Sequence, residues 1–412
     1  MIVGENEIFD LPEIGERLFI LRSNDDESTQ LFALGVEDEF ILDPTGDLDE
    51  LNSWIEQKRD WIFGYLSYDL KNKIENLQTN HPNNTGVHLA HFVCPKVVFE
   101  TGISGITIHK EDSRLNRGFI HSWYEKIKSI TSTTHHDGVE LQPAQNKEEY
   151  LYAVGKLKQH IHGGDIYEIN YCQEFSCRRK LNAPYATWLK LNKKTQAPFA
   201  AYFQLGQLHL MCGSPERFLK RTGTRVISQP IKGTIRRSAE PLMDQKLKDE
   251  LHDSLKERTE NVMIVDLVRN DLSRSAERGS VQVEKMFEPV TFKTVHHLVS
   301  TISASVKSEV SFIQLIRDTF PMGSMTGAPK IKAMELSDIY ERSSRGIYSG
   351  SVGYIKPNGD FDFNVVIRSI VYNSGLSYIS SHVGGAITAM CEPEKEYEEC
   401  LLKIRAVVEA LA

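Results

Sequence analysis

The clearest secondary-structure signal in this chain is a helical pattern that passes directly into a strand pattern. Asn146 and Glu149 have the spacing of a helix-capping box, and apolar residues then recur with the helical period until Gly163 and Gly164. Residues 166–177 alternate instead, which predicts a strand with one apolar core face and one polar face that lines a cleft. Residues 1 to about 130 show strand and turn patterns that predict a mixed α/β region as well.

Composition limits the kinds of partner that such a fold would have. The 412 residues are 40% hydrophobic and 25% charged, which is ordinary for one large or two medium globular domains. A net charge of −8 without any basic stripe argues against nucleic acid as a partner. No apolar run has the length of a membrane span and the acidic N-terminus lacks a signal-peptide core, so we expect a cytoplasmic protein with no membrane partner. The six scattered cysteines include no Cys-x-x-Cys pair and are typical of reduced thiols.

Local patterns also predict how the chain is divided. The polar residues 131–146 are the best linker candidate and separate an N-terminal region, 1–140, from a second region, 141–412. The second region is expected to contain a long helical region at about 239–268 and a last helix at about 393–411. The predicted core stripe of the last helix is Tyr397, Leu401, Ile404, Val408 and Leu411.

These two predicted helices each carry a pair of glutamates three residues apart, Glu257 with Glu260 and Glu396 with Glu399. Side chains at this spacing share one face of a helix. Like charges beside a buried face are costly unless a cation neutralises them, and four carboxylates suit a hard cation such as magnesium. A pair of surface glutamates with arginine neighbours is the common alternative, and the spacing leaves both interpretations open.

One lysine stands in an unusual backbone context. Lys232 lies between Pro230 and Gly233, after a β-rich run at 218–227, so we expect it on a tight connection. Burial there would lower the pKa of its amine and make the amine a usable nucleophile. A solvated lysine in a turn is the alternative.

Six motifs occur in a fixed order and together resemble the chorismate-utilising enzymes, the family of anthranilate, aminodeoxychorismate, isochorismate and salicylate synthases. They extend over about residues 146–412, and a weaker match covers residues 63–69. The resemblance implies an α/β (α+β) fold with two stacked antiparallel sheet assemblies, helices outside and an active-site cleft between them. The motifs are residues 164–170, 212–218, 230–234, 257–271, 323–330 and 396–399.

Lysine at position 232 resembles the aminodeoxychorismate synthase branch of the family, whereas the anthranilate synthases that the chain resembles carry alanine there. The resemblance implies amination of chorismate at ring carbon four, through a covalent bond between Lys232 and ring carbon two. The alternatives are an anthranilate synthase component I, which aminates carbon two, and a non-catalytic chorismate-binding subunit that regulates a partner. The sequence contains no Cys-His glutaminase signature, so ammonia is expected from a separate glutamine amidotransferase subunit.

The resemblance implies a role for each residue of the site. Glu216 matches the acid that protonates the departing hydroxyl. Glu260 and Glu399 match the principal ligands of Mg²⁺, with Glu257 and Glu396 as their partners, direct or through water. Arg368 and Tyr348 are expected to clamp the enolpyruvyl carboxylate. The whole set expected to bind chorismate is Gly233, Thr234, His297, Tyr348, Arg368, Gly384 and Lys403.

Three positions depart from the family pattern. Glutamine is usual where this chain has Glu168, and isochorismate and salicylate synthases carry a water-activating lysine there. Glu168 therefore argues against water as the nucleophile. Ala386 replaces a glycine and is expected to narrow a loop near the bound carboxylate, and Glu174 replaces a common arginine. None of these departures removes a catalytic group.

Overall fold

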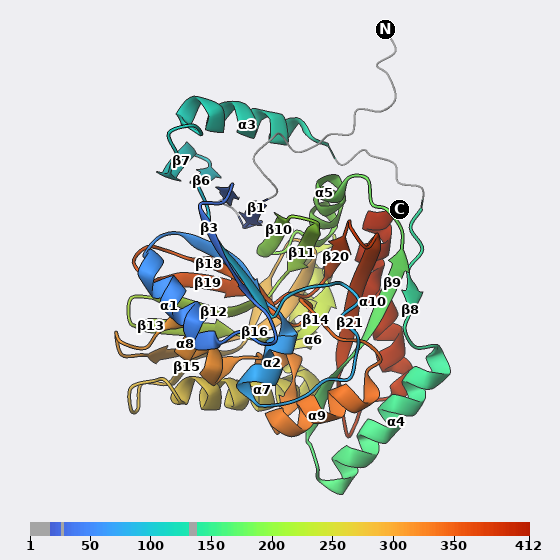
Figure 1. The fold of residues 1–412 in the computed structure, drawn as a ribbon. Coiled ribbons are helices and arrows are strands. Elements are labelled where there is room, and N and C mark those ends of the chain that lie inside the picture. Colours follow the sequence, from blue (N-terminus) through green and yellow to red (C-terminus); the bar gives the residue numbers. More distant parts are fainter. Residues whose placement is uncertain (1–16, 26–28, 132–137) are drawn as a thin grey trace.

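The computed structural model describes residues 17–25, 29–131 and 138–412, which form two antiparallel sheets with helices packed on them (Figure 1). The acidic N-terminal segment and residues 132–137 of the expected linker lie outside the described residues. This architecture confirms the predicted fold class. None of the helices in the described part of the chain is long and apolar enough to cross a membrane.

The larger sheet has eleven strands in the described part of the chain, and β8 (Gln142–Pro143) pairs with β9 beside the main path. The others lie in the order β17 (Gly327–Ala328), β9 (Glu168–Arg178), β21 (Tyr378–Thr388), β20 (Ser369–Asn373), β11 (Leu208–Ser214), β10 (Phe199–Leu205), β1 (Arg17–Arg22), β2 (Gln30–Leu34), β6 (Val97–Gly102) and β7 (Gly105–Lys110).

The second sheet has ten strands among the described residues, and β15 (Gln282–Thr291) pairs with β16 beside the main path. The others lie in the order β14 (Ile231–Arg236), β16 (Val295–Ser305), β13 (Arg225–Gln229), β12 (Arg217–Thr222), β19 (Phe361–Asn364), β18 (Ser351–Ile355), β4 (Ile62–Leu66), β5 (Ala90–Cys94) and β3 (Asp38–Leu42).

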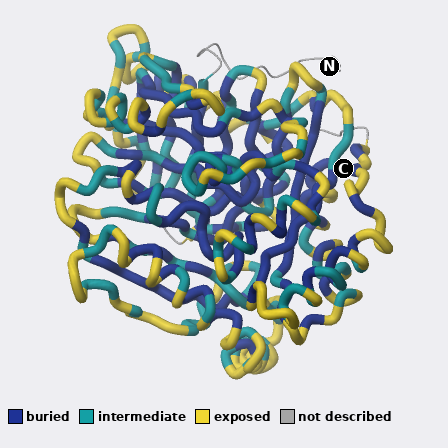
Figure 2. The backbone as a smooth tube through the Cα atoms, turned by 60° about the horizontal axis from the view of Figure 1, so that its bottom comes forward, coloured by how far each residue is buried: buried dark blue, intermediate teal, exposed yellow. Residues whose placement is uncertain are grey.

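Three apolar cores stack the layers of the molecule. One core packs α4, α5 and α10 on the larger sheet, a second packs α1, α7 and α8 on the other sheet, and a third joins the two sheets. Buried residues accordingly run through the strands while exposed residues gather in loops and on outer helix faces (Figure 2). The helices are α1 (Leu48–Lys58), α2 (Lys71–Ile74), α3 (Arg117–Ser129), α4 (Lys147–Gly163), α5 (Pro184–Thr195), α6 (Pro241–Asp253), α7 (Leu255–Ser273), α8 (Phe312–Thr319), α9 (Lys330–Tyr340) and α10 (Pro393–Leu411).

Helix α4 confirms the prediction made from the residues that begin and end it. Asn146 accepts a hydrogen bond from the backbone of Glu149, the Glu149 side chain accepts one from the backbone of Asn146, and Gly164 ends the helix in the left-handed conformation. The predicted helical region at 239–268 is confirmed, and it consists of two helices, α6 and α7. Ser254 has an extended backbone at the break, and its hydroxyl accepts from the backbone of Glu257, so it caps α7.

The predicted core stripe of the last helix is wrong in part. On α10, Leu401 and Val408 are 43% and 40% exposed, whereas Cys400 and Val407 are buried. The buried face is therefore turned by about one residue from the predicted stripe, to fit the larger sheet. In β9 both faces are buried from Glu168 to Phe175, so the polar face that was predicted to line a cleft lies in the interior.

Strands from the N-terminal region belong to both sheets. Strand β1 pairs with β10 in the larger sheet, and β4 pairs with β18 in the second sheet. Phe19 and Phe63 from this region pack against each other in the core between the sheets. The division of the chain at residue 140 stays a prediction.

Candidate active site

A buried ion pair crosses from one sheet to the other at the sheet edges. Lys232 belongs to β14 in the second sheet, and Glu168 is the first residue of β9 in the larger sheet. The Lys232 Nζ lies 2.6 Å from Glu168 Oε1, and the two side chains are 10% and 1% exposed. The alternative of a solvated turn lysine is therefore wrong, because Lys232 lies in a strand with its amine in the interior.

The charge state of Lys232 differs from the sequence-based expectation. Burial by itself favours the neutral amine, but the negative charges of Glu168, Glu260 and Glu216 outweigh burial and raise the pKa of Lys232. The expected fall in the pKa of this lysine is therefore wrong. Lys232 is held as an ammonium, so an attacking amine needs a proton acceptor.

Glu216 lies where the chain passes from the larger sheet to the second sheet, between β11 and β12. Burial raises the pKa of its carboxyl to about 7, against the opposing effects of Ser324, Lys232 and Arg368. The Ser324 hydroxyl donates a 2.6 Å hydrogen bond to Glu216 Oε1. A carboxyl that is partly protonated at neutral pH is suited to general acid catalysis.

Helices α7 and α10 bring the predicted glutamates to one place. The ammonium of Lys256 lies 3.9 Å from Glu260 Oε1 and 3.8 Å from Glu396 Oε1, so it links the two helices. Glu257 and Glu399 also act on the pKa of Lys256, and together the four carboxylates raise it against the effect of burial. The structure thus places two of the four beside one lysine that the sequence analysis did not identify, and the other two near enough to act on its charge.

The glutamates have the donor chemistry that a hard cation needs. Burial raises the pKa of Glu260 to about 7 and raises those of Glu257 and Glu396, and Glu260 Oε1 has no hydrogen-bond partner among the described residues. In the described part of the chain, no three of the four place ligand oxygens within 4.8 Å of one another. A metal at these carboxylates would therefore draw them closer together.

Lys403 links Gly384 of β21, a predicted substrate residue, to the Glu399 carboxylate of α10. Its Nζ lies 2.6 Å from Glu399 Oε1 and donates a 2.7 Å hydrogen bond to the Gly384 carbonyl. Burial by itself would raise the pKa of Glu399, but the neighbouring Lys403 ammonium outweighs burial and lowers it. A Cβ at Gly384 would lie only 2.5 Å from Cys172 Sγ, so glycine is required there. Ala386 lies within β21 opposite Asn170, which corrects the expectation that it narrows a loop.

Gly233 brings β14 against α7. Its φ is +83°, and an added Cβ would lie 3.0 Å from Glu257 Oε2, so both its conformation and the space around it favour glycine. The next residue, Thr234, places its hydroxyl 2.8 Å from His297 Nδ1. Burial lowers the pKa of His297 to about 3, so its ring is neutral, and its Nε2 has no partner in the described part of the chain.

The two residues expected to clamp a carboxylate have different surroundings. The Arg368 guanidinium has no hydrogen-bond or ion-pair partner among the described residues, and burial lowers its pKa despite the nearby charge of Glu216. Tyr348 stacks on His382 with ring centroids 5.3 Å apart, and its hydroxyl accepts from Cys172 Sγ at 3.9 Å. Tyr348 and Arg368 form no hydrogen bond with each other, so their joint role in binding a carboxylate stays a prediction.

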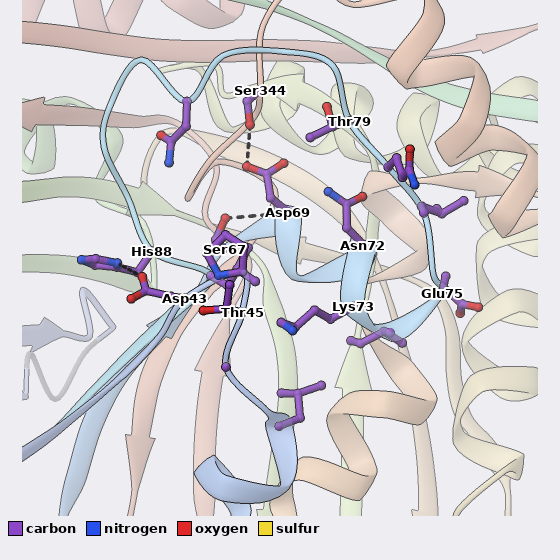
Figure 3. Close-up of a pocket in the computed structure, with 18 of the residues that line it drawn as sticks. Asp43, Thr45, Ser67, Asp69, Asn72, Lys73, Glu75, Thr79, His88 and Ser344 are labelled. Atoms are coloured by element: carbon purple, nitrogen blue, oxygen red, sulfur yellow. Dashed lines mark hydrogen bonds and ion pairs between the residues drawn. The ribbon is translucent and has the colours of Figure 1, made fainter.

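A cavity of about 1200 Å³ lies away from all of these residues, between α1, α2 and the connection that follows α2 (Figure 3). Some of its charged groups have partners within the chain. Ser344 donates to Asp69 at 2.5 Å, and His88 Nδ1 lies 2.6 Å from Asp43. None of the predicted site residues lines this cavity, so the candidate active site is the cluster at the sheet edges.

Comparison with known proteins agrees with the fold. The chain belongs to the family of chorismate binding enzymes, whose sequence profile matches residues 24–409.

Relatives with assigned names match about two thirds of the chain. It is 43% identical over 274 residues to "Aminodeoxychorismate synthase, chloroplastic" of Arabidopsis thaliana, covering 65% of this chain and 29% of the relative. It is 37% identical over 270 residues to "Aminodeoxychorismate synthase component 1" of Escherichia coli, covering 66% and 59%. The match thus spans less than two thirds of the length of either relative.

A solved structure extends the similarity over the whole fold. The crystal structure of anthranilate synthase component I from Streptococcus pneumoniae covers 98% of this chain and 95% of its own, with a TM-score of 0.77 and 24% identity. This likeness includes the N-terminal strands that the sequence motifs match only weakly.

Proposed function

We propose that the chain is an aminodeoxychorismate synthase component I, which converts chorismate and ammonia to 4-amino-4-deoxychorismate on the route to 4-aminobenzoate and folate. The observation that carries the proposal is the buried Lys232, which lies between the two sheets among carboxylates that can exchange protons with it. Similarity to relatives of that name supports the same reaction. Anthranilate formation needs no such lysine, because ammonia there attacks ring carbon two directly.

Lys232 is the nucleophile in the first half of the proposed reaction. Its free amine forms a bond to ring carbon two, the ring double bond shifts, and the bond from carbon four to its hydroxyl breaks. Glu216 gives a proton to the departing oxygen, which leaves as water. Ammonia then forms a bond to carbon four, the double bond shifts back, and the bond to Lys232 breaks. Glu216 takes the surplus proton from the new amine and is ready for another cycle.

Magnesium is the cation that the glutamates would hold, with Glu260 and Glu399 as principal ligands and Glu257 and Glu396 as their partners. Its charge would neutralise the ring carboxylate of chorismate and hold the ring in place. The chemistry of the donors supports this assignment, as does the Glu260 oxygen that lacks a hydrogen-bond partner.

The remaining polar residues would orient chorismate. Arg368 would bind the enolpyruvyl carboxylate, because a guanidinium without a partner inside the protein favours a bidentate anion. Tyr348 would assist it, and Thr234 and the neutral His297 would donate or accept single hydrogen bonds. Gly233, Gly384 and Lys403 would bound the space around the ring.

A separate glutamine amidotransferase subunit would supply the ammonia, and the printed name "component 1" of the Escherichia coli relative supports a second component. The six free cysteines support the expectation of a reducing, cytoplasmic environment.

The proposal is tested by identifying the product. The purified chain is incubated with chorismate, magnesium chloride and ammonium chloride at pH 8, and the products are separated by chromatography and identified by mass. We expect 4-amino-4-deoxychorismate as the main product, and glutamine in place of ammonium should give none without a partner. Anthranilate or isochorismate as the main product, or chorismate binding without turnover, would overturn the proposal.

A further inference from the structure

The carboxylate of Glu168 is buried beside Lys232 with half of its hydrogen-bonding capacity unused. Its Oε1 accepts the 2.6 Å hydrogen bond from Lys232 Nζ, while its Oε2 is buried and has no partner in the described part of the chain. The residue is 1% exposed. A carboxylate in this setting can accept a proton without losing contact with the amine that gives it up.

The backbone holds Glu168 in place from both sides. In β9 it pairs with Ala328 of β17 on one side and with Thr388 of β21 on the other. A Cβ at Gly327 would lie 2.3 Å from the Glu168 carbonyl oxygen, so glycine is required for this close approach. The carboxylate therefore comes from a fixed strand, which suits a group that must meet a reacting atom in one geometry.

The other carboxylates near Lys232 are less suited to accept its proton. Glu216 is held by Ser324 at 2.6 Å, and in the proposed reaction it must carry a proton of its own to the departing hydroxyl. Glu260 influences the charge of Lys232 but forms no ion pair with it, and it belongs to the group that would hold magnesium. Glu168 is the carboxylate that is hydrogen-bonded to the amine.

We infer that Glu168 is the proton acceptor that frees the amine of Lys232 for attack, an inference that rests on the proposed function. One N–H bond of the ammonium breaks, its proton moves to Glu168, and the released electron pair forms the bond to ring carbon two. When ammonia bonds to carbon four, the electron pair of the bond to Lys232 returns to the nitrogen. Lys232 then takes its proton back from Glu168, so each cycle restores both groups.

The test compares Glu168→Gln with the unaltered chain, because glutamine keeps the shape and can still accept a hydrogen bond but cannot take a proton. The first measurement needs no chorismate. The rate at which an amine-reactive reagent labels Lys232 is followed against pH by peptide mass spectrometry. Removal of the carboxylate charge should lower the pKa of Lys232, leaving Glu216 and Glu260 as the nearby acids.

The second measurement is the single-turnover rate of attack on chorismate at pH 7. In Glu168→Gln we expect a fall of about 10²–10⁴-fold, the usual range for a lost general base, and a rate that rises with pH as solvent takes the proton. Glu168→Asp should recover part of the loss. Glu174→Gln is the matched control, since Glu174 lies on the same strand but accepts from Tyr378 and Ser380, and it should leave both measurements unchanged.

The two measurements together separate proton transfer from simple charge. A lower pKa of Lys232 combined with slower attack supports the inference, because a purely electrostatic partner would give faster attack once its charge is removed. Attack at an unchanged or higher rate in Glu168→Gln would overturn it. If the unaltered chain forms no 4-amino product at all, the proposed function fails instead, and the labelling result still reports on the ion pair.

Discussion

At the scale of single residues, each group that would react is hydrogen-bonded to one polar side chain. Glu168, together with Glu260 and Glu216, keeps Lys232 charged, and Ser324 holds Glu216 while burial raises the pKa of that acid to about 7. The two reacting groups thus carry the protons that they would give up. Lys232 would lose its proton before it attacks, and Glu216 would donate its proton as the hydroxyl leaves.

Replacing Lys232 tests whether it forms a bond or only supplies charge. Lys232→Arg keeps a positive charge but cannot be deprotonated, so we expect 4-amino-4-deoxychorismate formation to fall by at least about 10³-fold. Lys232→Ala should lose the same product and, since it opens space beside ring carbon two, form a small amount of the carbon-two amine. The products are measured by chromatography and mass. Near-normal turnover in Lys232→Arg would contradict a covalent role.

Replacing Ser324 tests the assignment of Glu216 as the acid. The hydrogen bond from Ser324 favours the ionised carboxylate, so Ser324→Ala should raise the pKa of Glu216 above about 7. An acid acts while it is protonated, so activity is lost as pH rises through this pKa. We therefore expect the alkaline fall in the pH–rate profile to move to higher pH in Ser324→Ala. A fall that stays in place would show that another group carries the proton.

At the scale of elements, the arrangement depends on where α7 and α10 begin. Ser254 starts α7 so that Glu257 lies in its first turn, and Pro393 starts α10 so that Glu396 does. Acidic side chains in a first turn interact favourably with the helix dipole, which helps to offset the mutual repulsion of the carboxylates.

The position of Lys256 between these helices predicts a competition with the metal. Its ammonium lies near 4 Å from both Glu260 and Glu396, and it is half exposed, so it can swing away. Lys256→Met should bind magnesium about tenfold more tightly and melt at a lower temperature without metal, because the carboxylates lose their counter-charge. Calorimetric titration and thermal unfolding measure the two effects.

Two further variants serve as controls for the Lys256→Met experiment. Lys332→Met, which removes a lysine paired with Glu335 on the surface of α9, should change neither quantity. Glu260→Gln should weaken magnesium binding, because it removes a principal ligand. Unchanged affinity in both Lys256→Met and Glu260→Gln would reject the metal site.

At the scale of the whole molecule, the site depends on the alignment of two sheets that share strands from all parts of the chain. Lys232 and Glu168 meet because β14 and β9 lie near the corresponding edges of their sheets. The core between the sheets contains Phe19 and Phe63 from the N-terminal region and Phe203 from the second region. The N-terminal strands therefore help to set the distance between the reacting groups.

This shared core predicts how a fragment would behave. Residues 141–412 by themselves would lack β1 and β4, leaving the apolar strands β10 and β18 with unpaired edges. We expect the fragment to lack a cooperative thermal transition and to bind hydrophobic dyes, whereas the whole chain unfolds cooperatively. Circular dichroism during heating measures this. A fragment that melts cooperatively near the temperature of the whole chain would show that the division at residue 140 separates independent domains.

Local patterns were sufficient for features that depend on neighbouring residues. The capping box of α4, the bounds of α10 and the placement of glutamate pairs on helices all follow from spacing along the chain, because a helix brings residues three and four apart together. Family motifs then identified Lys232, Glu216 and the four glutamates as one group, and the structure places these charged groups near one another.

Contacts between distant segments were decided by the tertiary structure. The partners Glu168 for Lys232, Ser324 for Glu216 and Lys256 for Glu396 come from elements far apart in sequence. The charge on Lys232 was predicted with the wrong sign of pKa shift for the same reason. Burial of Lys232 depends on the residue and on its own strand. The carboxylates that outweigh the effect of burial on its pKa come within a few ångströms only when the two sheets pack together.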